Sequence, residues 1–337
     1  MTINIFIQVT QNLHFSNSLI NCWQLIALIR HFKNVNMKSF IIILTIVLFN
    51  LSCHPGISPS NTAIVNTEKV NASGSTVLLG RISITALQKS PYKDWFNNGF
   101  SSYQSDKATI QTIQPLLANK KIEVFLGTWC GDSKREVPKL MRILTDAGYD
   151  TSLLSLICVD NGEKYKQSPQ HEEAGKNIHH VPTIIVYDGK QEMGRIIESP
   201  VISLEKDVAT ILKKESYTHH YQAIEYWLKN VPGINKEMDV VALEAVAEKL
   251  KGKTKHQGEF NAYGYMLLGQ EKYTQAINVF KLNNMLHPNI AGLWDSLAEG
   301  YVKAGNKKAA IAAYEKVLVL EPTNETAKKA IAQLQAL

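Results

Sequence analysis

The sequence predicts an α/β domain followed by an all-α region. Between residues 108 and 214, short apolar runs typical of strands alternate with segments whose apolar residues recur at helical spacing. Strand signals end near Tyr217, and helix signals dominate from there on. Within this last part, two windows align at a period of 34 residues. These observations predict a mixed sheet with helices over residues 76–215 and a helical array over residues 216–337.

The elements of the α/β part follow from local patterns. We expect strands over residues 76–84, 122–126, 152–159, 183–187 and 193–197, and helices over 108–117, 131–147, around 172–177 and 203–214. The aromatic segment Ser90–Phe100 is expected to complete this domain, with a substrate-binding lip near Cys130 as the alternative. The segment Asn161–His171 is polar and long, so we expect a surface loop there.

Cys130 is the candidate reactive residue, because it stands where the strand over 122–126 passes into the helix over 131–147. A thiol at that position faces the unpaired N–H groups and the positive dipole end of the first turn, which favour thiolate over thiol. Lys134 and Arg135 add positive charge nearby, while Asp132 opposes them.

Two motifs in the same order resemble the thioredoxin superfamily. In the first, Trp129 precedes Cys130, and Pro138 follows the cysteine by eight residues. In the second, Pro182 stands directly before a strand. The resemblance covers about residues 108–214 and implies a thioredoxin-like fold with a cis peptide bond at Pro182. It also implies that Trp129, Val181 and Pro182 bind a client backbone beside Cys130.

The chain departs from that family at two positions. Ser133 stands where a second cysteine is usual, and Val124 where a buried acid is usual. A Cys-x-x-Ser site can attack a disulfide but cannot resolve the mixed disulfide internally. Two functions therefore stay open. In one, Cys130 acts on client thiols and disulfides, with Ser133 donating a hydrogen bond to the thiolate. In the other, a redox-inactive domain binds protein partners as a scaffold.

The remaining thiol and the histidines have structural and functional interpretations. Cys158, in a predicted strand, is expected to be a small buried apolar residue, with a resolving role toward Cys130 as the alternative. His179 and His180 precede Pro182, but adjacent histidines rarely converge on a metal and no fourth ligand is evident. We expect no metal and no cofactor. One histidine lining the rim of the thiol site is the hypothesis, and a plain surface role is the alternative.

The N-terminal segment resembles a bacterial lipoprotein precursor. Residues 37–52 read as a signal peptide, Cys53 as the lipidated residue and residues 53–75 as a flexible tether. A plain signal peptide or an uncleaved anchor is the alternative. Residues 1–36 are interpreted as sequence upstream of a true start at Met37, with an unusually long n-region of the signal as the alternative. These features predict a lipid-anchored protein of the bacterial cell envelope, periplasmic or at the outer membrane.

The net charge of +6 does not indicate nucleic acid binding. Half of this excess lies in the first 52 residues, which contain no acidic residue, and charges of both signs are interspersed over the rest of the chain.

The helical array resembles tetratricopeptide repeats, whose length is 34 residues. Small, aromatic and proline positions align between the two windows: Phe260, Gly264, Ala276, Phe280 and Pro288 with Trp294, Ala298, Ala310, Tyr314 and Pro322. We expect repeats at about 257–290 and 291–324, a capping helix over 325–337, and helices over 219–229 and 238–250 that complete the stack. The resemblance implies a concave face for a peptide or a partner protein, with a packing appendage as the alternative.

Overall fold

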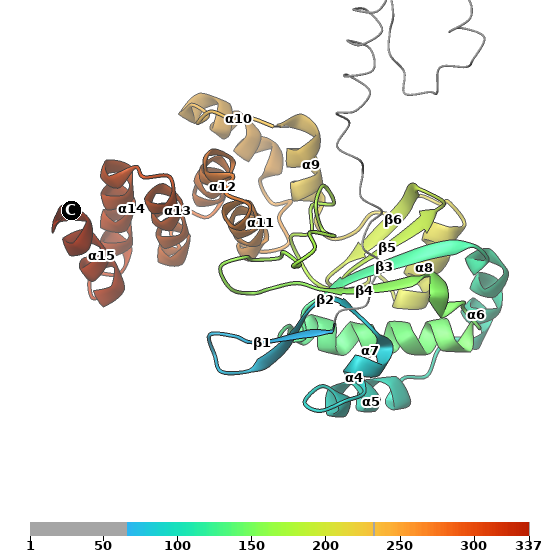
Figure 1. Ribbon diagram of the computed structural model, residues 1–337. Helices are drawn as coiled ribbons and strands as arrows, with labels where there is room; N and C mark the ends of the chain where they lie inside the picture. Colours follow the sequence, from blue (N-terminus) through green and yellow to red (C-terminus); the bar gives the residue numbers. More distant parts are fainter. Residues whose placement is uncertain (1–65, 232, 337) are drawn as a thin grey trace, which may run out of the picture. The chain divides into compact units, whose positions relative to one another are not determined.

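The computed structural model describes residues 66–231 and 233–336 (Figure 1). The predictions for the segment 1–36, the signal peptide over 37–52, the lipidated Cys53 and the tether as far as residue 65 lie outside the described residues.

A six-stranded mixed sheet forms the first part of the described chain. Its strands are β1 (Thr67–Val70), β2 (Thr76–Ile82), β3 (Lys120–Leu126), β4 (Leu154–Cys158), β5 (Thr183–Asp188) and β6 (Gln191–Ile197), in the spatial order β1-β2-β4-β3-β5-β6. Strands β3 and β4 are parallel, and every other neighbouring pair is antiparallel. The five strands predicted from the sequence are all present.

Strand β1 corrects the predicted end of the tether. Residues 67–70 pair with β2 in a hairpin, so the flexible segment cannot extend to residue 75. The polar composition that suggested a tether is that of a turn: Asn71 Oδ1 accepts hydrogen bonds from the amides of Ser73 and Ser75, and Gly74 has a φ of +78°.

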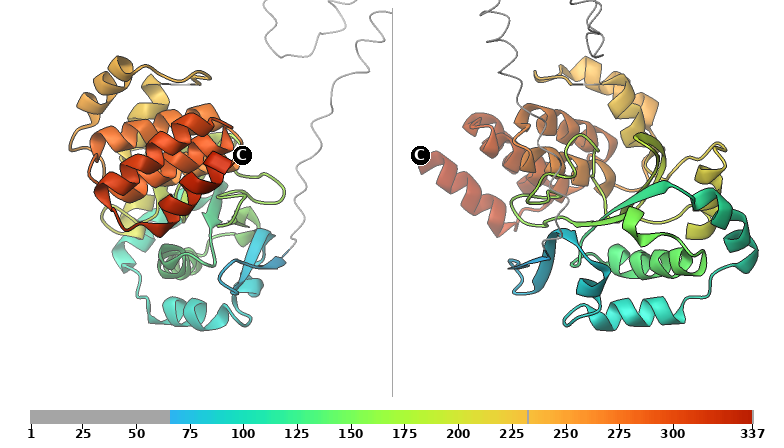
Figure 2. Two further views of the ribbon diagram at one scale, coloured as in Figure 1. Left: turned by 90° about the vertical axis from the view of Figure 1, so that its left-hand side faces the viewer. Right: turned by 45° about the vertical axis from the view of Figure 1, so that its right-hand side comes forward.

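Helices cover one face of the sheet, as Figures 1 and 2 show. They are α4 (Ile84–Leu87), α5 (Lys93–Ser102), α6 (Lys107–Ile113), α7 (Gly131–Asp146) and α8 (Leu204–Leu212), with short 3₁₀ turns at Gln114–Leu117 and Thr151–Leu153. Side chains alternate along each strand, so Val124 and Leu126 of β3 join the core under these helices while Phe125 points to the opposite face. The aromatic segment after Ser90 also joins this core, through Tyr92 and Phe96.

Helix α7 begins directly after Cys130, whose backbone is extended, with φ −87° and ψ 129°. Its apolar stripe, which includes Val137, Leu140 and Leu144, is fully buried against the sheet. Helix α5 packs on the outer side, where a Cβ built on Gly99 would lie 2.9 Å from the Cβ of Pro138. These contacts fix the start of α7, and with it the position of the thiol.

The connection between β4 and β5 differs from both predictions made for it. Residues 159–182 form turns and contain no helix, so the helix expected around 172–177 is wrong. His171, Gly175 and Asn177 all have positive φ, which interrupts a helix. The surface loop expected over 161–171 is present and exposed at residues 162–164 and 169–171, but its middle is buried, since Lys166 and its two following residues are at most 6% exposed.

Helices alone make up the second part of the described chain. They are α9 (Gln222–Asn230), α10 (Val240–Leu250), α11 (Gly258–Gly269), α12 (Tyr273–Leu286), α13 (Ala291–Lys303), α14 (Lys307–Leu320) and α15 (Glu325–Ala336). Successive helices from α11 to α15 pack side by side (Figure 2). Helix α9 packs on α11, where the rings of Trp227 and Phe260 lie 6.3 Å apart, and α10 packs on α12. No helix within these described ranges has the length and hydropathy needed to cross a membrane.

The sheet part and the helical part belong to one compact unit. Ile197, at the end of β6, joins the apolar core of the helices, and Tyr221, before α9, donates a hydrogen bond of 2.5 Å to Glu198. Lys255 pairs with the same carboxylate at 2.7 Å. The site described below therefore has walls from both parts of the chain.

The close approach of α11 and α12 requires glycine at residue 264. A Cβ there would lie 2.3 Å from the ring of Phe280, whereas a Cβ on Gly292 of α13 would meet nothing within 4 Å. We expect Gly264→Ala to destabilise the protein by about 1–3 kcal/mol through overpacking. Gly292→Ala, the matched control, should be neutral or stabilising by up to about 1 kcal/mol. Urea unfolding followed by circular dichroism tests this, and equal effects of the two changes would contradict the packing.

Candidate functional site

The candidate site is centred on the thiol of Cys130. Its Sγ donates a hydrogen bond of 3.2 Å to the carbonyl of Val181, and the cysteine is partly exposed and unpaired. The peptide bond between Val181 and Pro182 is cis, as predicted. The structure thus brings together two segments 51 residues apart in sequence: the start of α7 and the turn that enters β5.

The other predicted binding residues surround this contact. The indole of Trp129 donates a hydrogen bond of 2.9 Å to the carbonyl of Val159, which holds the ring against the end of β4. Val181 is 2% exposed, and the Pro182 carbonyl accepts a hydrogen bond of 2.7 Å from the amide of Glu198. The backbone beside the thiol is therefore held from both sides.

Ser133 lies beneath the thiol site and is fully buried. Its hydroxyl accepts a hydrogen bond of 3.1 Å from the amide of Gly127, which ties the first turn of α7 to the end of β3. Among the contacts of the described residues there is no hydrogen bond between Ser133 and Cys130. The contact that is present holds the strand-to-helix turn in shape.

Cys158 is fully buried in the core on the helix-covered face of the sheet, as its interpretation as a small apolar residue predicts. Burial raises the pKa of its thiol far above the usual range. Both Cys130 and Cys158 are free thiols, and Cys130 packs on the opposite face of the sheet, beside Phe125 and Ile157.

His179 and His180 are buried, so a plain surface role for them is wrong. Their Nδ1 atoms lie 2.7 Å apart, and the ring of His180 lies over that of Tyr221 with centroids 4.2 Å apart. Burial, followed by the charges of neighbouring cationic groups, lowers the pKa of both histidines well below 6.5. They form a neutral polar layer behind the turn at Pro182.

Sequence reasoning missed Lys166. Its side chain is buried with the ammonium nitrogen 4.5 Å from the ring centroid of Trp129 and 4.9 Å from that of Tyr165. Burial lowers its pKa from 10.5 to about 8, against the opposing effect of the Cys130 charge. A lysine inside a polar loop gives no sign of such burial in the sequence, because polar loops normally lie on the surface.

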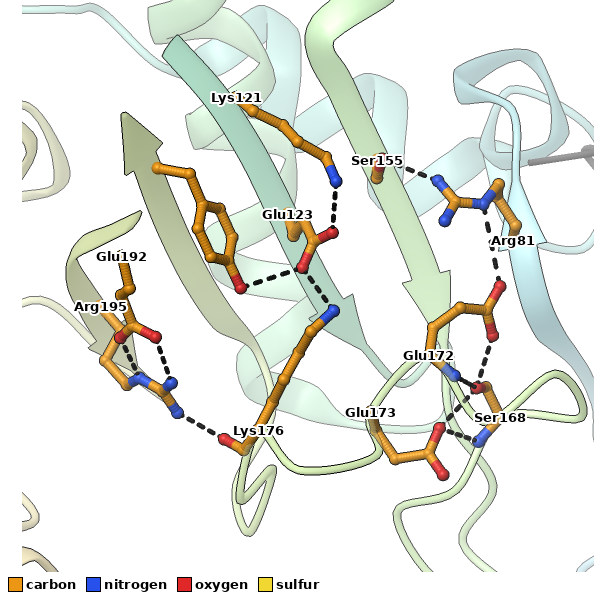
Figure 3. A network of polar contacts seen from close by, with 11 residues as sticks. Arg81, Lys121, Glu123, Ser155, Ser168, Glu172, Glu173, Lys176, Glu192 and Arg195 are labelled. Carbon is orange, nitrogen blue, oxygen red and sulfur yellow. Dashed lines mark hydrogen bonds and ion pairs between the residues drawn. The ribbon is translucent and has the colours of Figure 1, made fainter. Parts of the chain in front are cut away.

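A network of charged side chains on the second face of the sheet anchors the loop that carries Lys166 (Figure 3). The carboxylate of Glu123 accepts hydrogen bonds of 2.7 Å from Lys121 and from Lys176 of the loop. Burial acts to raise the Glu123 pKa, but these two lysines lower it below its usual value. Arg195 of β6 donates to the Lys176 carbonyl at 2.6 Å. The sequence carried one signal of this network, since Glu123 interrupts the apolar run of β3.

Closer to the β4 end of this loop, a second set of contacts holds the loop to β2 and β4. Arg81 donates to Ser155 at 2.7 Å and approaches Glu172 at 3.8 Å (Figure 3). The Ser168 hydroxyl lies 2.7 Å from a carboxylate oxygen of Glu172 and 2.6 Å from one of Glu173, and it donates its single proton to one of them at a time. Buried polar groups that are paired in this way hold an irregular segment without a helix.

Within the described part of the chain, no group of three or more histidine, cysteine, aspartate or glutamate side chains is arranged to hold a metal ion. Compared with known proteins, the sequence matches no family model and no curated protein.

Replacing Ser133 by alanine tests its structural role. The change leaves the buried Gly127 amide without an acceptor, so we expect a loss of about 1–3 kcal/mol in the free energy of unfolding. Denaturant unfolding measures this loss. An unchanged stability would show that this hydrogen bond does not hold the turn.

The buried histidines predict a loss of stability in mild acid. In the unfolded chain, these histidines bind protons near pH 6.5. In the native chain, they bind protons only at lower pH, because burial lowers their pKa. The free energy of unfolding therefore falls as the pH drops below about 6.5. Each histidine contributes a slope that approaches about 1.4 kcal/mol per pH unit as the pH falls toward 5. His180→Gln should flatten this slope by that amount in unfolding experiments from pH 7 to 5. A slope equal to that of the wild type would contradict the burial.

Proposed function

We propose that the α/β part is a thioredoxin-like domain in which Cys130 is a nucleophile for client thiols and disulfides. The contact of the Cys130 thiol with the Val181 carbonyl, directly before the cis bond to Pro182, carries this proposal. Three features of a nucleophilic thiol support it. The sulfur is partly exposed, it lies at the positive end of a sixteen-residue helix, and the backbone carbonyl of Val181 lies beside it.

The proposed reaction is thiol–disulfide exchange with a single protein cysteine. The Cys130 thiolate attacks one sulfur of a client disulfide, a mixed disulfide forms, and the other client sulfur leaves as a thiolate. An external thiol then attacks the mixed disulfide and regenerates Cys130. The position that would supply an internal second thiol is Ser133, and Cys158 lies in the core under the helices. The reaction therefore ends at the mixed disulfide until the external thiol arrives.

We further propose that the helices from α11 to α15 are a tetratricopeptide-repeat array that holds the client. This is supported by the paired packing of these helices and by the glycine at the closest approach of α11 and α12. A cavity of about 890 Å³ lies between α11, α13 and the loop over residues 161–165. Its wall includes Tyr165, Asn261, Tyr265 and Tyr314. Aromatic and amide side chains of this kind suit an extended peptide.

A protein-binding scaffold without redox activity is the second candidate function. The cavity favours it, because Trp129, Cys130 and Val181 are absent from the wall and binding there needs no thiol. In both proposals the chain acts in the bacterial cell envelope, anchored by a lipid on Cys53. That location rests on the sequence motif over residues 37–53 alone.

Trapping of a mixed disulfide distinguishes the two functions. Reduced protein is incubated with a disulfide-containing peptide, and the adduct is located by peptide mass mapping. We expect the adduct on Cys130, its loss in Cys130→Ala and its persistence in Cys158→Ala, because the second thiol is buried. Both thiols should react after denaturation, which controls for detection. Absence of an adduct on Cys130 in the folded protein would leave scaffold binding as the function.

A further inference from the structure

The side chain of Lys166 is buried, and in the described part of the chain its ammonium group has no charged partner in contact. The residue is 4% exposed, and within residues 66–231 and 233–336 its ammonium group makes no hydrogen bond or ion pair. Its neighbours are the rings of Trp129 and Tyr165. Each aromatic face offsets about 2 kcal/mol of the several kcal/mol that removing a charge from water costs. An anion beside the ammonium would therefore stabilise its charged form.

The loop holds this side chain in place. The Lys166 amide donates to the Asp160 carbonyl at 2.9 Å, the Asp160 amide donates to the Gln167 carbonyl at 2.9 Å, and the Gln167 side chain donates to the Gly269 carbonyl of α11. Lys166 itself has a φ of +60°, a conformation that costs a lysine about 1–2 kcal/mol. Strain of this kind is typical of functional positions.

Of the groups whose charges act on Lys166, only Cys130 is free to become its counter-ion. These groups are Cys130 directly before α7, Asp132 in its first turn, Glu198 after β6, and the neutral His179 and His180 of its own loop. Asp132 pairs with Arg135 at 2.7 Å, and Glu198 is held by Lys255 and Tyr221.

We propose that Lys166 is the acid–base partner of Cys130 in thiol–disulfide exchange. This inference rests on the proposed function. In the first step, the Cys130 thiolate attacks a disulfide R–S–S–R′, the Cys130–S–S–R bond forms, and the leaving R′ thiolate takes a proton from the Lys166 ammonium. In the second step, the neutral Lys166 amine takes the proton of an external thiol R″–SH, whose sulfur attacks the mixed disulfide. R–S–S–R″ leaves, and the thiolate and the ammonium are restored.

The site supplies this proton transfer where the sequence lacks the buried acid usual in the resembled family. Val124 occupies that position and is fully buried. A proton donor is most effective when its pKa lies near those of the groups it serves. The Lys166 pKa of about 8 is close to that of an ordinary aliphatic thiol, about 8.5.

The leaving group of the disulfide distinguishes charge stabilisation from proton transfer. The thiolate of a strongly acidic aromatic thiol leaves readily and gains little from a proton donor, whereas the more basic aliphatic thiolate leaves more slowly and gains more from one. We expect wild-type exchange with the aliphatic disulfide to slow above about pH 8 relative to exchange with the aromatic one, because Lys166 loses its proton there. This comparison uses the unaltered protein and needs no variant.

Three variants complete the test. Lys166→Arg keeps the charge but cannot donate a proton near neutral pH, so it should slow aliphatic exchange at pH 7 by about tenfold or more and leave aromatic exchange near the wild-type rate. Lys166→Met removes the charge as well and should slow both. Lys213→Met, an exposed control at the end of α8 whose ammonium lies 4.0 Å from Glu215, should change neither rate.

The outcomes separate this inference from the proposed function. If the wild type exchanges with neither disulfide, the proposed function fails. If exchange requires Cys130 but Lys166→Arg keeps the wild-type ratio of aliphatic to aromatic rates at every pH, the function stands and the assignment to Lys166 is overturned.

Discussion

The contact between the Cys130 thiol and the Val181 carbonyl is the constraint on which the site depends. It joins the start of α7 to the turn before β5, at 3.2 Å. The helix start is fixed by packing of its apolar stripe on the sheet and by the hydrogen bond from the Gly127 amide to Ser133. The turn is fixed by the Glu198 amide. A sulfur held between two such rigid elements presents one geometry to whatever binds there.

The loop between β4 and β5 adds charged and polar side chains around this contact. It crosses the second face of the sheet without a helix, because Glu123 and Arg195 anchor Lys176. It therefore brings Lys166 to the ring of Trp129, the residue directly before Cys130. We propose that a cysteine and a buried lysine here take the place of the cysteine and buried acid of the resembled family.

The sequence predicted what depends on local periodicity and on motifs. Every expected strand formed, helix α7 begins at the predicted residue, and the peptide bond at Pro182 is cis. The loop could not be predicted, because its order comes from pairs distant in sequence, such as Gln167 with Gly269 and Lys176 with Glu123. Lys166 lies in that loop, and its burial could not be predicted from the sequence. Whether a lysine is buried depends on its neighbours in the folded structure.

The charge coupling between Cys130 and Lys166 is tested most directly by a nuclear magnetic resonance titration of the Lys166 side chain, labelled at Cε, in the wild type and in Cys130→Ser. The account predicts a midpoint near pH 8 in the wild type and a lower one in the variant, because the thiolate charge that raises the Lys166 pKa is then gone. A midpoint near 10.4, the value of an exposed lysine, in both proteins would contradict a buried cation beside the thiol.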